Sequence, residues 1–247
     1  MTWLITAEAL RLMERATHRA PALRGARLLE ILGSSGTLAP GASGVAVIGY
    51  RSEQEFAQAV ASGQVPAVAR AVLYDPEDWS FTPAVEQRRP AHFEREFAIH
   101  AARQRLIPIL APALDLVRAI APGTADESTT FLNLRVLDHA ASALESTSGY
   151  VEIQGQSLER TTSLYRQFVV AAAAQIRQGD AKAHILAGLS TNPPGGPVTL
   201  AELRADVTAT RDVVAGFWLN VPGTGRSCPS CSPTDPTLGA ELLRDLA

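Results

Sequence analysis

Lysine is almost absent from this chain: Lys182 is the only lysine among 22 basic residues, and the others are scattered arginines. The basic residues do not outnumber the 25 acidic ones, and the formal net charge is −3. Nonspecific binding to nucleic acid depends on a surplus of basic side chains that neutralise phosphates. This balance therefore predicts that nucleic acid is not a partner.

The sequence also has no long apolar run. Its most apolar stretch, 168–174, is flanked by Arg166 and Arg177, whereas a membrane-spanning helix needs about 18 or more apolar residues. The apolar start of the chain is short and is soon followed by charged residues, which is not typical of a signal peptide. We therefore expect no membrane partner and favour a cytoplasmic location, although prior removal of a signal peptide would leave the same sequence.

Cysteine is scarce as well. Cys228 and Cys231 form a Cys-Pro-Ser-Cys segment in a stretch rich in proline, glycine and serine. Two cysteines cannot build a four-thiolate zinc site, and no histidine stands at finger-like spacing from them. A redox pair of the thioredoxin type is expected at the start of a helix near the beginning of the chain. We interpret the pair as a loop clip or as plain thiols, with metal and redox roles as alternatives.

What the sequence does contain is an alternation of short apolar strands with helices. Its 247 residues, 46% hydrophobic and 19% charged, are typical of a globular chain. Strands are predicted at 44–50, 69–75, 106–111, 150–155, 184–189 and 216–221, and helices at 52–62, 91–105, 129–144, 158–178, 199–214 and 236–246. Such alternation predicts parallel strands joined by crossover helices. The nearly continuous apolar character of the strands predicts that both of their faces are covered.

Six strands are clear, and two more would close an eight-stranded barrel. The candidates are 3–6, 27–32 and 131–136. We predict a single α/β domain over residues 1–247, a (β/α)8 TIM-type barrel that is irregular or incomplete if these segments are helical. The alternative is an open doubly wound parallel sheet. The chain has neither the glycine-rich dinucleotide fingerprint after its first clear strand nor a Walker A sequence, so no cofactor is predicted.

Carboxylates stand where two predicted strands end, which is where barrels of this type carry their chemistry. Asp75 and Glu77 follow the second clear strand, and Pro76 favours an extended chain that would place both on one face. Glu152 lies within the fourth, where a buried carboxylate is costly unless it pairs with an arginine or is functional. We therefore name Glu77, Asp75 and Glu152 as candidate catalytic residues.

Amides and aromatic residues at strand ends complete the predicted site. The candidates for substrate binding are Gln154, Gln156, Trp218, Asn220, Asn192 and Tyr50. Amides can hold hydroxyl or carbonyl groups, and a tryptophan can support a sugar ring. Trp218 also suits the core, and Asn220 also suits a loop cap. No metal is predicted, because no histidine is expected beside the three carboxylates.

Asp75-x-Glu77 resembles the end of the Asp-x-x-Asp-x-Asp-x-Glu signature of family 18 glycoside hydrolases. Their barrels also carry a tryptophan on the last strand, a position that Trp218 would match. This resemblance implies that Glu77 is the general acid and that Asp75 orients the N-acetyl group of the substrate. The sequence departs from the family at Arg70 and Leu73, which replace the upstream aspartates, and the later Tyr-Asp pair is also missing.

A second resemblance extends over the larger part of the chain. The segments 73–87, 151–158, 186–194 and 216–222, followed by the Cys-Pro-Ser-Cys segment, look like uncharacterised actinobacterial TIM-barrel proteins. This resemblance implies a shared barrel and assigns no activity.

Together these patterns predict a cofactor-independent enzyme that uses carboxylate acid/base chemistry at the C-terminal end of a barrel. Its most concrete form is a glycoside-hydrolase-like hydrolase acting on a carbohydrate or another small molecule. The first alternative is a lyase, cyclase or isomerase of small-molecule (secondary) metabolism that uses the same site. The second is a non-catalytic barrel that binds a carbohydrate or a partner protein.

Overall fold

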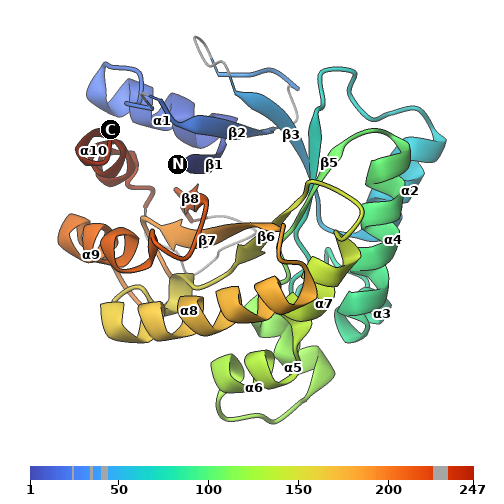
Figure 1. The fold of residues 1–247 in the computed structure, drawn as a ribbon. Helices are drawn as coiled ribbons and strands as arrows, with labels where there is room; N and C mark the ends of the chain where they lie inside the picture. The colour runs from blue at the N-terminus through green and yellow to red at the C-terminus, as the bar shows by residue number, and fades with distance from the viewer. Residues whose placement is uncertain (24, 34–35, 40–43, 225–232) are drawn as a thin grey trace. The chain divides into compact units, whose positions relative to one another are not determined.

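Eight parallel strands follow one another in chain order around a closed barrel in the computed structural model (Figure 1). The structure describes residues 1–23, 25–33, 36–39, 44–224 and 233–247. The strands are β1 (Thr2–Thr6), β2 (Arg27–Leu32), β3 (Val45–Tyr50), β4 (Ala71–Tyr74), β5 (Ile107–Leu110), β6 (Tyr150–Ile153), β7 (His184–Ser190) and β8 (Gly216–Asn220). The predicted TIM-type barrel is confirmed. The open sheet is wrong, because the strand order closes on itself, with the last strand, β8, paired to β1.

The two strands that were uncertain from sequence are β1 and β2. The third candidate, 131–136, is wrong as a strand: it spans the end of one helix and the start of the next. The single helix predicted at 129–144 is also interrupted, since Arg135 adopts the left-handed conformation with φ 55°. Asp126 begins the first of these helices, and its side chain accepts a hydrogen bond from the Thr129 N–H. Cys228 and Cys231 lie outside the described residues.

The helices are α1 (Ala7–Thr17), α2 (Glu53–Ala61), α3 (Ala84–Arg88), α4 (Pro90–Arg103), α5 (Val117–Ile120), α6 (Glu127–Asn133), α7 (Val136–Ala143), α8 (Thr162–Gly179), α9 (Leu200–Thr210) and α10 (Pro236–Asp245), with short 3-10 helices at Leu114–Leu116 and Gln156–Leu158. The predicted helices at 52–62, 91–105, 158–178, 199–214 and 236–246 are present with shifted ends, whereas the sequence did not predict α1, α3 and α5. Thr199 and Glu202 form the predicted capping box of α9. None of the helices in the described ranges is long and apolar enough to cross a membrane.

The chain forms two compact units. The first comprises residues 1–46, 155–169 and 186–247, and the second comprises residues 47–154 and 170–185. In the first unit β2, β1 and β8 pair side by side, and α1 packs against α10. In the second unit the strands from β3 to β6 pair in order, and α4 packs against β4, β5, α2 and α7. The second unit contains all three predicted catalytic carboxyls.

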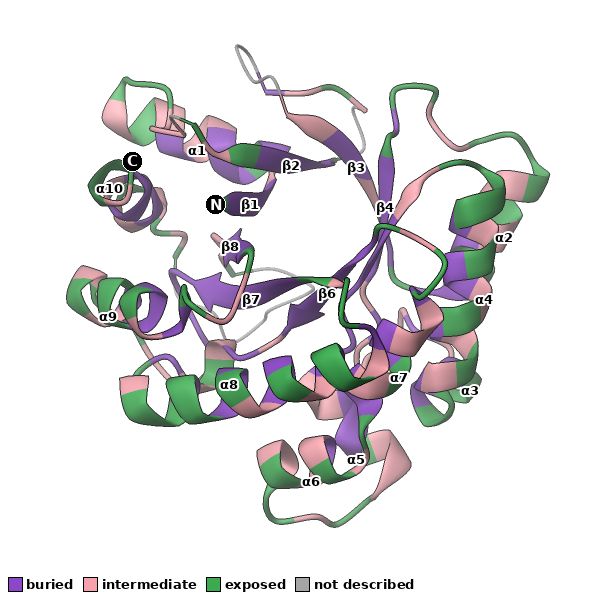
Figure 2. Ribbon diagram, in the orientation of Figure 1, coloured by how far each residue is buried: buried purple, intermediate pink, exposed green. Residues whose placement is uncertain are grey.

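An aromatic cluster between the strands and helices of the second unit fixes which way β4 faces. The Tyr74 ring stacks on Phe97 of α4 with centroids 5.0 Å apart, and Phe97 also contacts Phe56 of α2 at 4.6 Å. All four residues of β4 are buried (Figure 2). Because successive side chains of a strand point to opposite faces, Leu73 and Asp75 face away from this helical layer. The Tyr50 ring joins the cluster, 4.9 Å from Phe56, so this predicted substrate-binding side chain packs among helices.

Glu86 of α3 joins β4 to the start of α2. Its Oε2 accepts hydrogen bonds from the Glu53 N–H at 2.7 Å and from the Tyr74 hydroxyl at 2.8 Å, and its Oε1 accepts one from the Gln54 N–H at 3.2 Å. The first N–H groups of a helix have no partner within the helix. A carboxylate from a distant part of the chain satisfies two of them, and so holds α3 against α2.

We expect Glu86→Gln to lower the free energy of unfolding by about 2 kcal/mol. Both carboxyl oxygens of Glu86 accept hydrogen bonds, and glutamine replaces one of these oxygens with an NH2 group that cannot accept them. Urea denaturation measures the change. The same substitution at the exposed Glu145 should change stability by less than about 0.5 kcal/mol. Equal effects at the two positions would contradict the anchoring role of Glu86.

Candidate active site

The ends of β4, β5 and β6 meet at one amide side chain. The backbone N–H of Asp75 donates to the Tyr50 carbonyl at 3.0 Å, so the β3–β4 ladder continues one residue past β4. Nε2 of Gln154 donates to Oδ1 of Asp75 at 2.9 Å and to the Ala111 carbonyl at 3.1 Å. Gln154 therefore reaches from the end of β6, across the end of β5, to the carboxyl that follows β4.

Glu152 lies two residues before Gln154 and therefore points to the same face of the sheet. Its side chain is fully buried, and neither carboxyl oxygen has a hydrogen-bond partner among the residues that the structure describes. Burial raises the pKa of Glu152 well above its ordinary value, and the charges of Asp75 and Glu77 raise it further. In the described part of the chain no arginine pairs with Glu152, so the ion-pair alternative finds no support.

Glu77 lies on a loop that one hydroxyl group holds in place. The Glu77 N–H and the Trp79 indole N–H both donate to Oγ1 of Thr82, at 3.2 and 2.9 Å, and this hydroxyl donates to the Arg51 carbonyl at 2.7 Å. The Gln87 amide donates to the carbonyls of Glu77, Trp79 and Thr82. β4 ends at Tyr74, but the backbone pairing continues beyond it: the Ala113 N–H donates to the Pro76 carbonyl at 3.1 Å. The chain turns at Glu77, whose carbonyl accepts a hydrogen bond from the Trp79 N–H.

The three carboxyls differ in pKa. Burial raises the pKa of Asp75 to about 7, while the hydrogen bond from Gln154 and the charge of Arg51 oppose that rise. Burial, followed by the charges of Asp75 and Asp115, raises the pKa of Glu77 to about 9. Asp75 therefore ionises first. Slightly above neutral pH the site holds one carboxylate beside carboxylic acids, a combination that supplies a base and a proton donor.

Arg51 holds a positive charge near these groups. Its guanidinium lies over two rings of the loop, 4.5 Å from the centroid of Phe81 and 5.3 Å from that of Trp79. This charge lowers the pKa of both Asp75 and Glu77. Sequence reasoning did not single out Arg51, although it directly follows a predicted strand.

Asp115 connects the loop after β5 to the same site. Its Oδ1 accepts a hydrogen bond from the Asp78 N–H at 3.0 Å, and burial raises its pKa. The half-buried rings of Trp79 and Phe81, in edge contact at 5.2 Å, provide an aromatic surface on the Glu77 loop. Sequence reasoning expected such a surface from Trp218 and missed these residues. The signal available was the position of Trp79 and Phe81 soon after the end of β4, and of Asp115 soon after the end of β5.

The remaining predicted binding residues belong to the first compact unit, whereas the carboxyl cluster is built from the second alone. Gln156 begins a 3-10 helix after β6. The Asn192 N–H donates to the Ser190 hydroxyl, and the Asn220 carbonyl accepts from the Thr191 N–H. Trp218 of β8 is buried, as its core interpretation predicts.

No group of three or more histidine, cysteine, aspartate or glutamate side chains within the described ranges is arranged to hold a metal ion. The sequence matches no known protein family and no curated protein.

The bond from Gln154 makes a specific prediction for Asp75. Gln154→Met removes the N–H donor while keeping the length of the side chain, so we expect the pKa of Asp75 to rise above its wild-type value. Carboxyl ¹³C NMR titration measures the change. The same substitution at the exposed Gln64 should leave the titration unchanged, and an unchanged or lower pKa in Gln154→Met would contradict the role of this hydrogen bond.

Proposed function

We propose that this protein is an enzyme that works by general acid/base catalysis at the C-terminal ends of β4 and β6. The observation that supports it is the carboxyl cluster, in which the pKa of Asp75 is about 7 and that of Glu77 about 9. Efficient acid/base catalysts have pKa values close to the working pH. Glu77 is the proton donor, Asp75 is the ionised partner, and Glu152 is a third, fully buried acid.

Hydrolysis of a glycosidic bond is the most concrete reaction for this site. Glu77 gives its proton to the glycosidic oxygen as the bond from the anomeric carbon to that oxygen breaks. The charge of Asp75 stabilises the positive charge that develops on the sugar. Water then adds to the anomeric carbon and loses a proton to Asp75, and solvent restores both groups. The partly exposed rings of Trp79 and Phe81 offer an apolar surface for the face of a sugar.

A lyase or isomerase acting on a small molecule is the second candidate, and the environment of Glu152 favours it. A fully buried carboxyl without a described hydrogen-bond partner is suited to proton transfer in a site that excludes water. In this case Asp75 would remove a proton from carbon and Glu77 would return one elsewhere on the substrate.

The test is turnover of methyl and nitrophenyl glycosides of several sugars, followed by ¹H NMR. We expect kcat/KM to rise with pH as Asp75 loses its proton near pH 7 and to fall as Glu77 loses its proton near pH 9. Asp75→Asn should lower kcat/KM by about 100-fold or more. The control, Glu145→Gln, changes an exposed carboxylate of the same unit and should have no effect.

Two other outcomes would overturn the hydrolase. Asp75-dependent uptake of deuterium from solvent into a non-glycosidic substrate would support the lyase or isomerase. Saturable sugar binding without any turnover, with the same affinity in Glu77→Gln, would identify a binding barrel and contradict catalysis.

A further inference from the structure

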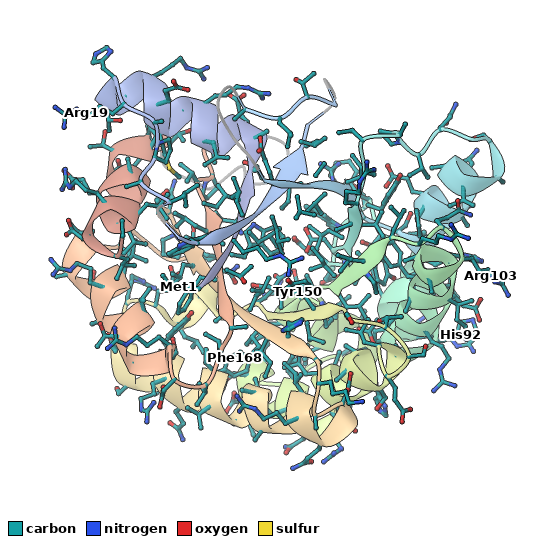
Figure 3. The ribbon with its side chains drawn as sticks, turned by 45° about the horizontal axis from the view of Figure 1, so that its top comes forward. Met1, Arg19, His92, Arg103, Tyr150 and Phe168 are labelled. Carbon is teal, nitrogen blue, oxygen red and sulfur yellow. The ribbon has the colours of Figure 1, made fainter. Side chains whose placement is uncertain are left out.

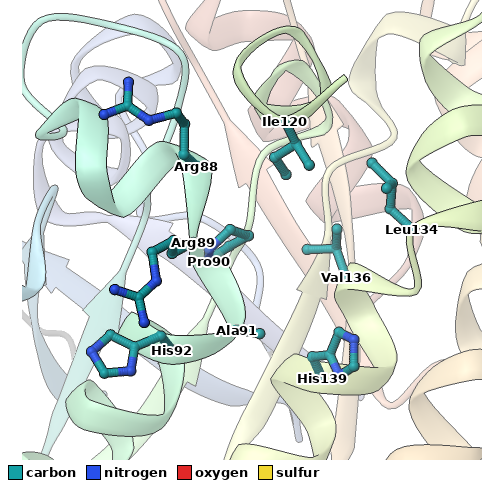
Figure 4. Close-up of a pocket in the computed structure, with 9 residues that line it drawn as sticks. All are labelled: Arg88, Arg89, Pro90, Ala91, His92, Ile120, Leu134, Val136 and His139. Carbon is teal, nitrogen blue, oxygen red and sulfur yellow. The ribbon is translucent and has the colours of Figure 1, made fainter. Parts of the chain in front are cut away.

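A cavity of about 300 Å³ lies in the second unit, apart from the residues of the carboxyl cluster. It opens between the start of α4 and the start of α7, and Ile120 at the end of α5 borders it (Figure 4). The carboxyl site uses none of the residues that line this cavity. Its volume is at the lower end of the range for small-molecule pockets.

One side of the cavity is apolar. Ile120, Leu134 and Val136 lie across from Pro90 (Figure 4). Val136 and Pro90 are buried, and Ile120 and Leu134 are half-buried. An apolar group of a ligand would remove these surfaces from water, which is favourable in proportion to the area covered.

The rim of the same cavity carries Arg88, Arg89, His92 and His139, all of them exposed. No hydrogen bond or ion pair within the described ranges engages the side chains of Arg88, Arg89 or His139. Both guanidinium groups extend away from the apolar side (Figure 4), and nothing described holds them there. Arginine binds carboxylate and phosphate groups through paired hydrogen bonds.

We propose that this cavity binds a small amphipathic anion: one carboxylate or phosphate group attached to an apolar body about the size of a single ring. The apolar body would lie against Leu134 and Val136, and the anionic group would be held at the rim by Arg88 and Arg89. The positive charges of the rim attract such an anion. Charge thus directs the anion to this cavity.

The test must separate the cavity from the carboxyl site, because α3 contributes to both. Gln87, which holds the Glu77 loop, immediately precedes Arg88. A variant on the opposite wall, Leu134→Ser, removes apolar surface without changing α3. The matched control is Arg103→Gln, at the last turn of α4 and about 20 Å along the helix from Pro90. Figure 3 labels Arg103 and His92 on this helix.

Isothermal titration calorimetry with benzoate and with phenyl phosphate measures binding and distinguishes a carboxylate ligand from a phosphate. We expect at least one of them to bind saturably with a Kd of about 1 mM or lower. Benzyl alcohol has the ring but no charge, and inorganic phosphate has the charge but no ring. Each should bind at least about tenfold more weakly than the better aromatic anion. The double variant R88Q/R89Q should weaken binding at least about tenfold, Leu134→Ser at least about fivefold, and Arg103→Gln should leave it unchanged.

Three results would overturn the proposal. One is the lack of saturable binding for both aromatic anions. Another is binding that R88Q/R89Q and Leu134→Ser leave intact. The third is inorganic phosphate or benzyl alcohol binding as tightly as the better aromatic anion, which would mean that charge alone or apolar contact alone accounts for the affinity. Circular dichroism of each variant confirms that it is folded.

Discussion

Replacing Glu77 with glutamine is expected to lower kcat/KM for alkyl glycosides by about 10² to 10⁴, the range typical of losing a general acid. Burial, followed by the charges of Asp75 and Asp115, raises the pKa of Glu77 to about 9, so Glu77 carries a proton at neutral pH. Glutamine keeps the shape of the side chain but has no acidic proton to give to a leaving oxygen. The measurement is steady-state hydrolysis of paired substrates that share a sugar and differ in leaving group.

The leaving group separates loss of the acid from general damage to the site. A dinitrophenolate group departs without being protonated, so Glu77→Gln should lower its release by less than about tenfold. Glu145→Gln should leave both substrates unaffected, since Glu145 is exposed. Equal losses on the alkyl and dinitrophenyl glycosides would contradict the assignment of Glu77 as the proton donor.

Replacing Glu94 with methionine is expected to stabilise the protein, and increasingly so as the pH rises. Glu94 of α4 is fully buried, and neither of its carboxyl oxygens has a hydrogen-bond partner among the described residues. Burial raises its pKa from 4.5 to about 8. The folded protein therefore binds this proton more tightly than the unfolded chain does, and raising the pH from 4.5 to 8 lowers the stability.

The Glu94 share of this loss is at most about 5 kcal/mol between pH 4.5 and pH 8, the free-energy equivalent of its pKa shift. Methionine fills a similar volume and has no proton to lose, so the stability difference between variant and wild type should grow over this range. Urea denaturation at pH 5 and pH 8 measures it. Glu145→Met, at an exposed position, is the control. A difference that stays constant with pH would contradict the buried, proton-binding state of Glu94.

The fold could be predicted largely from local patterns. Apolar runs gave the positions of the six clear strands, and side-chain caps such as Ser52 and Thr199 marked the helix starts. The prediction of a strand at 131–136 is wrong because this segment spans the end of α6, the left-handed Arg135 and the start of α7. Short helices such as α3 and α5 have too few residues to show a helical period, so no pattern in the sequence predicts them.

The residues of the candidate site could be predicted only where a polar side chain directly follows the end of a strand. Asp75 and Gln154 were found in this way, and the structure joins them by a hydrogen bond across 79 residues of sequence. The anchoring of α2 by Glu86 depends on contacts 32 and 33 residues away. Such contacts arise from the packing of whole elements, and no local periodicity encodes them. The same holds for the position of Arg51 over two aromatic rings.

We infer that the carboxyls after β4 and within β6 keep their protons at pH values where ordinary carboxyls have lost them. Titration of ¹³C-labelled carboxyl groups by NMR tests it most directly, with signals assigned through Asp75→Asn, Glu77→Gln and Glu152→Gln. We expect titration midpoints near pH 7 for Asp75 and near pH 9 for Glu77, and we expect Glu152 to titrate well above its ordinary range. Midpoints at the ordinary values, 3.8 for aspartate and 4.5 for glutamate, would contradict it.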